Sequence, residues 1–306
     1  MIRSIDDVRF LVTPFAISGA PRPVIGVDGP VQGADVCYDH HASGETVNLL
    51  AIPQTVPWPG TVATTMVDGD AAISAAVVLV RAAGEGEAVR TVWPVLYEAA
   101  HYCDHLIPSG VHPGAEQAGL GLHCWLKDRG FRSLRSAASE PVPSWQTKSR
   151  VFQDLAVALV SAIRNGEMPS DFAYLERLDA FEAEVRNAIR GVHGDITVLQ
   201  PLRYVDAMAT YRVIETDLVL LVGGHATGGT SYTIGVHPRA YDRIDLRPAL
   251  AALAAREPGW GGRRNAGGSP LQCGSRLTVE QVIDLVRTAA QRHDGQDLPW
   301  KSPSSS

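Results

Sequence analysis

The 306-residue chain has no long hydrophobic run. A helix that crosses a bilayer needs about 20 consecutive, mostly apolar residues, and no stretch of this sequence approaches that length. The first ten residues, MIRSIDDVRF, include two aspartates and lack the apolar core and small-residue cleavage site of a signal peptide. We therefore expect a cytoplasmic protein that has no membrane partner.

Cysteine and positive charge are also scarce. The four cysteines are far apart in the sequence, and none belongs to the CxxC pair of a zinc ribbon. With a net charge of −6, the chain lacks the overall positive field with which proteins hold long nucleic acids. These absences favour free thiols over disulfides, and a small ligand or short nucleic acid over a long one.

The sequence does contain short apolar runs that end in acidic or histidine residues. RPVIGVDG, GADVCYDHH and GTVATTMVDGD are typical of buried strands, and the third leads into an Ala/Val-rich helix over about 70–83. In α/β folds, polar groups gather at the carboxyl ends of parallel strands. We therefore predict an α/β fold whose first part is a mainly parallel sheet with flanking helices.

The rest of the chain divides into a helical part and a mixed part. Helices are predicted over about 92–106, 115–129, 148–165 and 170–191. From about residue 196, RYVDAMATYRVI, DLVLLVGG and TSYTIGVHP indicate strands, with HATGG as a hairpin turn. The helical sequences DLRPALAALAARE and TVEQVIDLVRTAAQRH follow. This order predicts a second, smaller α/β domain.

Four groups of acidic or histidine residues could carry chemistry. They are Asp28; Asp39, His40 and His41; Asp68 and Asp70; and His101, Asp104 and His105. Hard divalent cations prefer carboxylates, and manganese also accepts imidazole. Two such ions about 3.5–4 Å apart can clamp a phosphoryl group during its transfer. The first three groups lie at predicted strand ends, so we expect them to meet at one edge of the sheet.

Each group also has an interpretation without chemistry. Asp28 precedes a glycine and could be a turn residue, and Asp70 could cap the next helix. The fourth group lies in the amphipathic sequence VLYEAAHYCDHLI, where residues three and four apart share a face that could simply be solvated. Asp39-His40-His41 is the hardest to explain in this way, and it favours contact with metal or phosphate.

Three motifs together resemble a known family. YDHHASGE carries the Asp-His-His signature of the DHH phosphoesterase superfamily, and VDGDAAISAAVVL is similar to the Asp-x-Asp motif of that family. SYTIGVHP, followed by IDLRPALAALAAREPGWGGRRNAGGSP, resembles its accessory DHHA1 domain, which has a glycine-rich loop that binds substrate. The resemblance covers about residues 24–80 and 210–290.

The resemblance implies hydrolysis of a phosphoester with two Mn²⁺ or Mg²⁺ ions. The metal ligands that it implies are Asp28, which would bridge the ions, His40, Asp68, Asp70 and Asp104. His41 would face the scissile phosphate, and Asp39 would orient the histidines. The implied substrate-binding residues are Gly261, Gly262, Arg263, Arg264 and Asn265.

The chain departs from the family pattern in three places. The Asp-x-Asp motif follows the Asp-His-His motif here, whereas it precedes it in the family, so the order looks permuted. Thr64 stands where the family has a histidine, and we expect one ion site to be weakened. Arg263 replaces the histidine of the glycine loop, and its planar guanidinium suits a phosphate. The loop could also be a flexible connection, but its arginines favour anion binding.

We therefore expect a DHH-like metal-binding domain (1–135), a helical linker region (136–204) and a DHHA1-like substrate-binding domain (205–300). The predicted function is metal-dependent hydrolysis of a small phosphorylated substrate, such as a short oligonucleotide or a nucleotide phosphoester. The alternative is a catalytically degenerate regulatory module that binds a nucleotide or phosphate. A different hydrolase with convergent aspartates would leave the glycine loop unexplained. The protein could form a homodimer.

Overall fold

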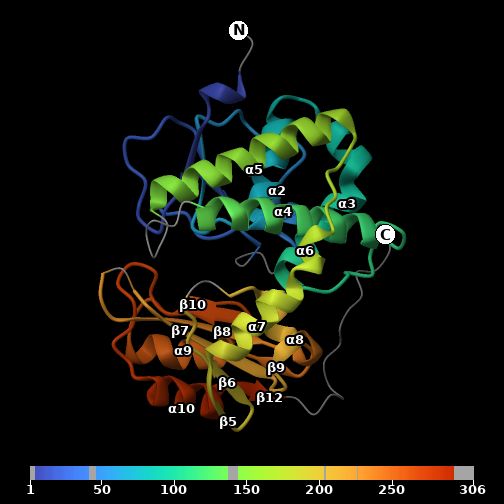
Figure 1. Cartoon of the computed structure of the whole chain (residues 1–306). Coiled ribbons are helices and arrows are strands. Elements are labelled where there is room, and N and C mark those ends of the chain that lie inside the picture. Colours follow the sequence, from blue (N-terminus) through green and yellow to red (C-terminus); the bar gives the residue numbers. More distant parts are fainter. Residues whose placement is uncertain (1–3, 41–45, 137–143, 203–204, 226, 293–306) are drawn as a thin grey trace. The chain divides into compact units, whose positions relative to one another are not determined.

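The computed structural model describes residues 4–40, 46–136, 144–202, 205–225 and 227–292 (Figure 1). The chain divides into two compact units, Met1–Arg177 and Leu178–Ser306. The segment 136–204, which the sequence suggested as a linker region, therefore contributes to both units. None of the described helices is both long enough and apolar enough to cross a membrane.

The first unit contains a four-stranded parallel sheet in the order β1-β4-β2-β3. Its strands are β1 (Arg9–Val12), β2 (Val24–Val27), β3 (Val36–Tyr38) and β4 (Thr61–Thr64). Strands β2 and β4 are buried at every position, as expected for the inner strands of a sheet that is covered on both faces. The predicted α/β fold with a parallel sheet is confirmed.

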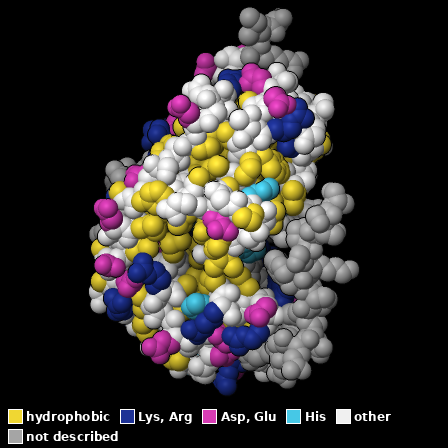
Figure 2. Space-filling view, turned by 90° about the vertical axis from the view of Figure 1, so that its right-hand side faces the viewer, with side chains coloured by type: hydrophobic (Ala, Val, Ile, Leu, Met, Phe, Trp, Pro, Cys, Tyr) yellow, Lys and Arg dark blue, Asp and Glu magenta, His cyan; other side chains and the backbone are white. Residues whose placement is uncertain are grey.

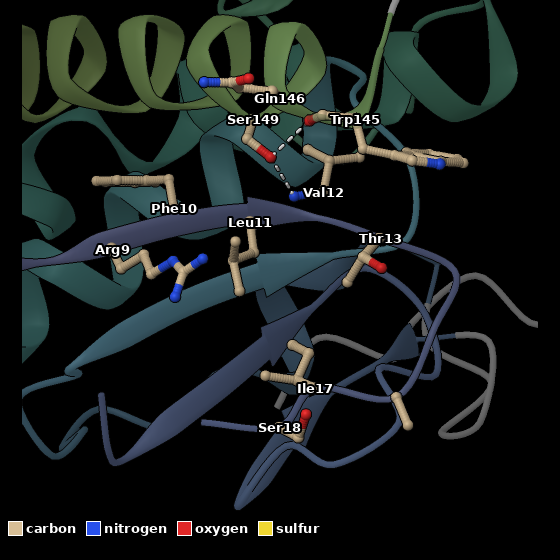
Figure 3. A pocket seen from close by; sticks show the side chains of 11 residues that line it. Arg9, Phe10, Leu11, Val12, Thr13, Ile17, Ser18, Trp145, Gln146 and Ser149 are labelled. Carbon is tan, nitrogen blue, oxygen red and sulfur yellow. Dashed lines mark hydrogen bonds between the residues drawn. The ribbon is translucent and has the colours of Figure 1, made fainter. Parts of the chain in front are cut away.

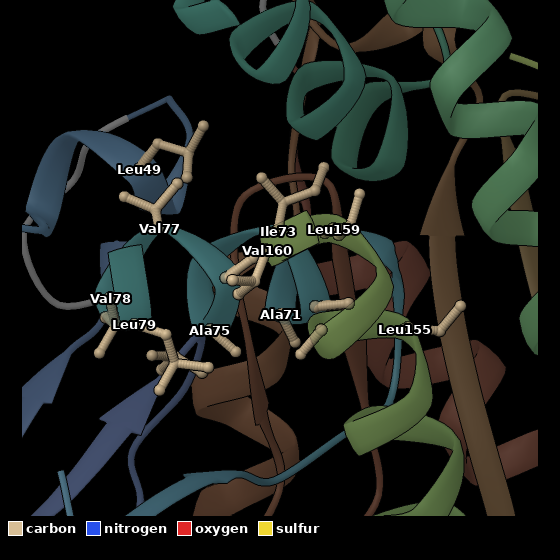
Figure 4. Packing of buried hydrophobic residues seen from close by; sticks show 14 of the residues in the cluster. Leu49, Ala71, Ile73, Ala75, Val77, Val78, Leu79, Leu155, Leu159 and Val160 are labelled. Carbon is tan, nitrogen blue, oxygen red and sulfur yellow. The ribbon is translucent and has the colours of Figure 1, made fainter. Parts of the chain in front are cut away.

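Helices cover one face of this sheet. They are α2 (Gly69–Ala82), α3 (Gly86–His105), α4 (Glu116–Ser136), α5 (Trp145–Asn165) and the short α6 (Ala173–Glu176). Figure 4 shows Ile73 and Val77 of α2 in one apolar cluster with Leu159 of α5. Helix α2 is buried on almost every side, because its alanines and valines let neighbouring elements approach closely.

The opposite face is packed by the segments that connect the strands. In the described part of the unit, its apolar cluster combines Val24 and Ala63 of the strands with Ile17 and Val31 of the connections. Successive strand residues point to opposite faces, so Ile25 belongs to the helix-side cluster whereas Val24 does not. The sheet is thus buried on both faces with helices on one of them.

The second unit contains a six-stranded mixed sheet in the order β10-β11-β8-β7-β6-β5. Its strands are β5 (Ile189–His193), β6 (Ile196–Leu199), β7 (Leu218–Gly224), β8 (Thr230–Val236), β10 (Gly261–Gly262) and β11 (Ala266–Gly268). Only the β6–β7 pair of this sheet is parallel. Helices α9 (Arg247–Arg256) and α10 (Val279–Ala289) pack into its apolar cluster.

Shorter elements complete the two units. They are the 3₁₀ helices η1 (Ile5–Asp7), η2 (Asn48–Ala51) and η3 (Pro238–Ala240), the helices α7 (Leu178–Ala188) and α8 (Ala207–Val213), and the strands β9 (Ile244–Asp245) and β12 (Gln291–Arg292). The predicted hairpin around HATGG is confirmed, since β7 and β8 pair antiparallel on either side of it.

The strand prediction for RYVDAMATYRVI is wrong, because part of this sequence forms α8. The carboxylate of Asp206 accepts a hydrogen bond from the Ala209 amide at 3.0 Å and caps the helix. The helix predicted over 170–191 is also interrupted, and β5 begins at Ile189. In both places a local cap or a strand pairing outweighs the apolar spacing that guided the prediction.

The surface in Figure 2 carries many apolar side chains together with mixed charges. Among the described residues in this view, Lys and Arg are interspersed with Asp and Glu and do not form one large basic area. Phe15, Met66 and Val192 are among the large apolar residues exposed to solvent. Single apolar side chains at the surface are usual and do not by themselves indicate an interface.

Candidate functional site

Residues that follow three different strands meet at one edge of the parallel sheet. Asp28 follows β2, His40 follows β3, and Asp70 lies in the first turn of α2, after β4. Because β2 lies between β4 and β3, the residue that follows it is central. One potential ligand atom from each of Asp28, His40 and Asp70 lies within 4.8 Å of the other two, and all three residues are buried.

A fourth residue reaches this cluster from α3. His40 Nε2 lies 3.2 Å from Asp28 Oδ1 and 3.7 Å from Asp104 Oδ2. The other two residues of the fourth group make different contacts. His101 Nδ1 is 2.9 Å from the carbonyl oxygen of Ile107, and its ring lies 4.3 Å from the ring of His105, centroid to centroid. The helix face therefore contributes Asp104, while these two histidines pair with each other.

Asp68 and Asp70 occupy different positions at the start of α2. Asp68 is the N-cap residue, and its Oδ1 accepts a hydrogen bond from the Ala71 amide at 3.1 Å. Asp70 lies inside the first turn and is buried. Its Oδ2 atom accepts no hydrogen bond from the described residues. The cap that the sequence suggested for Asp70 is thus formed by Asp68, and Asp70 is directed into the cluster.

Burial and the neighbouring carboxylates raise the pKa values of Asp68 and Asp70. Burial together with the charges of Asp28 and Asp104 raises the pKa of Asp68 to about 7, against the opposing effect of the hydrogen bonds with Asp70 and Ala71. Burial also raises the pKa of Asp70 well above its usual range, and the neighbouring carboxylates add to this shift. A buried group of like charges costs free energy, and a divalent cation bound among them would remove that cost.

The donor set fits a hard divalent cation. It offers carboxylate oxygens and one imidazole, which suits Mn²⁺ or Mg²⁺. Thr64 is buried, and its hydroxyl donates to the Met66 carbonyl at 3.0 Å. The hydroxyl of Thr64 is therefore engaged in the loop after β4.

The backbone of His40 is held by Asn48, which the sequence motifs do not include. Asn48 of η2 accepts a hydrogen bond from the His40 amide at 3.0 Å through Oδ1. The Asn48 side chain also donates to Ser74 Oγ of α2 at 2.9 Å. Asn48 and Ser74 are both fully buried. Asn48 gives no signal in the sequence, because a polar residue before Leu49 looks like part of a loop.

The other two residues of the Asp-His-His motif are Asp39 and His41. Asp39 is half-buried between β3 and His40. His41 lies outside the described residues. At Asp28 the backbone adopts a left-handed φ of 51°, and its amide donates to the Tyr38 carbonyl at 3.0 Å. This bond ties the ends of β2 and β3 together where the two chains leave the sheet.

The predicted glycine loop forms a small hairpin in the second unit. Gly262 pairs with Gly267 in the β10–β11 ladder, and the Arg263 amide donates to the Ala266 carbonyl at 2.7 Å. Gly262 has a φ of 151°, and an added Cβ would lie 2.3 Å from Gly267 Cα, so only glycine fits. The Asn265 carbonyl accepts a hydrogen bond from the Val236 amide at 2.8 Å. The turn is thereby fixed to the end of β8.

The two arginines of this turn differ in their contacts. Arg264 Nη2 donates to the Asp242 carbonyl at 3.0 Å, and the Arg264 carbonyl accepts from the Leu246 amide at 2.8 Å. Burial raises the pKa of the Tyr211 phenol, and the charge of Arg263 opposes this shift. Arg264 therefore has a hydrogen bond within the fold in addition to its expected role.

A separate pocket of about 590 Å³ lies along β1 in the first unit (Figure 3). It lies between the first turn of α5 and residues 16–18. Ser149 Oγ accepts a hydrogen bond from the Val12 amide at 2.9 Å and donates to the Trp145 carbonyl at 2.8 Å. None of the residues predicted to act in catalysis or binding lines this pocket.

Comparison with known proteins adds little to this description. No family model matches the chain, and no curated protein matches its sequence. Among solved structures, the chain is similar to one described as "pGpG-specific phosphodiesterase - PggH from Vibrio cholrae", with a TM-score of 0.40 and 14% sequence identity. The match covers 87% of this chain and 81% of that chain. A function for this chain therefore has to be inferred from its own side chains.

Proposed function

We propose that the protein is a divalent-metal-dependent phosphoesterase. Its substrate is a small phosphorylated molecule, such as a short oligonucleotide or a nucleotide phosphoester. The observation that carries this proposal is the buried group of Asp28, His40 and Asp70, whose potential ligand atoms lie within 4.8 Å of one another. Asp104 lies beside His40 in the same cluster.

In this proposal the cluster holds two Mn²⁺ or Mg²⁺ ions. Asp28, His40, Asp68, Asp70 and Asp104 would hold these ions. When bound, such ions polarise a phosphoryl group and lower the pKa of a coordinated water. The burial of the ligands limits competition by bulk water, which strengthens every electrostatic interaction in the site.

The other residues of the chain position these groups. Asn48 fixes the backbone that carries His40, and the capping bond of Asp68 fixes the first turn of α2. Asp39 is assigned the role of orienting the histidines, and His41 that of contacting the scissile phosphate. In the second unit, the substrate phosphate is bound by Arg263 and Arg264 together with Asn265 and the backbone of Gly261 and Gly262.

The second candidate function is a regulatory module that binds a nucleotide or phosphate without turnover. Thr64 favours it, because its hydroxyl already donates to the Met66 carbonyl and the histidine expected there is absent. With one ligand fewer, one ion would bind weakly and the clamp on the phosphoryl group would be incomplete.

Metal titration combined with a hydrolysis assay tests the proposal. Chelator-treated protein is titrated with Mn²⁺ by calorimetry and then assayed with a generic phosphodiester, bis(p-nitrophenyl) phosphate. We expect about two bound ions and metal-dependent turnover. Asp28→Asn should lose both, whereas Asp154→Asn, a matched change at an exposed position of α5, should lose neither. Nucleotide binding without turnover would favour the regulatory module, and absence of metal binding would contradict the phosphoesterase.

A further inference from the structure

Tyr211 of α8 rests directly on the backbone of strand β8. A Cβ added at Gly235 would lie 2.1 Å from the Tyr211 hydroxyl oxygen, so a side chain at this position would displace the phenol. Gly235 faces away from the α9–α10 side of the sheet, since its neighbours Ile234 and Val236 belong to the apolar cluster on that side. The glycine therefore provides the space that the phenol occupies.

His237 contacts both the backbone and the ring of Tyr211. His237 Nε2 lies 2.9 Å from the Tyr211 carbonyl oxygen, and the two rings meet edge to face with centroids 5.4 Å apart. These two contacts of His237 restrict rotation of the Tyr211 side chain. Its hydroxyl is thus presented at a defined place on the sheet.

The hydroxyl at this place makes no hydrogen bond within the described part of the chain. Partly buried phenol hydroxyls usually have a partner. Tyr232, on the opposite face of the same strand, follows that rule and donates to the Leu277 carbonyl at 2.8 Å. Burial raises the pKa of Tyr211 far above its usual range, with the Tyr241 phenol adding to the shift and Arg263 opposing it. The hydroxyl therefore stays protonated and can act as a donor.

Arg263 lies close to this donor. Gly235, beneath the phenol, is in register with Ala266 of β11, and the Ala266 carbonyl accepts the hydrogen bond of the Arg263 amide at 2.7 Å. The charge of Arg263 acts on the Tyr211 hydroxyl. A neutral donor and a guanidinium that share one region of the sheet suit a ligand with several acceptor oxygens and a negative charge.

We propose that Tyr211 donates a hydrogen bond to the same phosphate group of the ligand that Arg263 binds. The choice of phosphate as the anion rests on the proposed function. The proposed hydrogen bond from Tyr211 to the ligand is argued from three observations. They are the Tyr211 hydroxyl, its packing against Gly235 and the charge of Arg263. Tyr211 then determines affinity for the phosphorylated form of the ligand over the unphosphorylated form.

Binding of AMP and adenosine to the full-length protein tests this role. Calorimetric titrations are made with each compound, in the presence of Mn²⁺ and again in the presence of a chelator. Tyr211→Phe should weaken AMP binding about tenfold to a hundredfold, as for a lost hydrogen bond to a charged group, and should leave adenosine binding unchanged. Tyr232→Phe, which removes a hydroxyl already bonded within the protein, should leave the affinity for both compounds unchanged.

A second variant displaces the hydroxyl without removing it. Gly235→Ala should weaken AMP binding as much as Tyr211→Phe, and the double variant should lose no more than either single one. Gly223→Ala on β7 is the matched control, because an added Cβ there meets nothing within 4 Å. The proposal fails if wild-type protein binds no AMP, or if Tyr211→Phe binds it as tightly as wild type. It also fails if adenosine binding weakens equally. Tyr211→Phe could lose AMP affinity while the wild-type protein neither binds Mn²⁺ nor hydrolyses phosphodiesters. That result would support the proposed role of Tyr211 and contradict the proposed phosphoesterase activity.

Discussion

His40 Nε2 lies 3.2 Å from Asp28 Oδ1, although the two residues follow different strands of the sheet. Strands β2 and β3 are parallel neighbours, so their carboxyl ends lie at the same edge. The pairing places an imidazole against a carboxylate in a buried position, where each needs a partner or an ion. This relationship is the centre of the proposed metal site, and the predictions below follow from the residues around it.

The stability of the metal-free protein should fall as the pH rises from about 4 to about 7. Burial raises the pKa of Asp68 to about 7, whereas a carboxyl of an unfolded chain titrates near 3.9. Between these values the folded state holds a proton that the unfolded state has released, so unfolding becomes more favourable as the pH rises. Thermal melts in a chelator should therefore give a lower melting temperature at pH 7.5 than at pH 5.

Bound Mn²⁺ should remove this loss of stability near pH 7. A bound cation favours ionised carboxylates, and it stabilises the folded state by binding that state alone. The melting temperature at pH 7.5 should rise with Mn²⁺ concentration, while that at pH 5 should rise less. A melting temperature that is insensitive to pH in the chelator would show that the carboxylates do not crowd one another as the structure indicates.

Asp68→Asn should abolish phosphoester hydrolysis while leaving the fold intact. Asparagine is as good an N-cap as aspartate and keeps the hydrogen bond to the Ala71 amide, so α2 should still begin at the same place. The variant loses one negative charge among the proposed ligands. Removing a residue that only supports a metal ligand typically lowers metal affinity or activity about 10–100-fold. Loss of a ligand itself should lower activity at least as much. Activity that survives with unchanged metal dependence would leave Asp68 as a helix cap only.

Asn48→Ala should weaken metal binding without touching a proposed ligand. The change leaves the buried amide of His40 without its acceptor, and an unsatisfied buried group costs about 1–3 kcal/mol. We expect metal affinity to fall about tenfold to a hundredfold, measured by Mn²⁺ calorimetry. Ser74→Ala is the control, because it removes the other partner of Asn48 and keeps the bond to His40. Equal losses in both variants would point to general destabilisation of the core.

The sheet and most of the cluster follow from simple patterns, because apolar runs ending in aspartate or histidine predict strands whose ends meet. The sequence could not show that Asp104 rather than His101 joins His40, since both lie on one helical face and only tertiary packing decides the rotation of α3. The contact of Asn48 with His40 also depends on a fold that brings η2 against α2. The sequence does not predict helix α8, because valine, threonine and tyrosine also suit strands, and the cap at Asp206 decides the structure.

Both arginines of the glycine hairpin should contribute to the binding of a phosphorylated ligand. Arg263→Ala should raise the dissociation constant for a phosphorylated ligand about tenfold to a hundredfold, because charge-assisted hydrogen bonds contribute about 1.5–3 kcal/mol. Arg264→Ala should weaken ligand binding by a similar factor. It should also lower the melting temperature, since Arg264 donates a hydrogen bond to the Asp242 carbonyl within the fold.

Calorimetry with AMP and thermal melts of the same variants check these outcomes together. Arg256→Ala is a matched control, because it removes an arginine from the end of α9, outside the hairpin. A fall in melting temperature with unchanged ligand affinity in Arg263→Ala would make the hairpin a structural element. It would also remove the link between the second unit and phosphate, because both the anion site and the role of Tyr211 depend on that guanidinium.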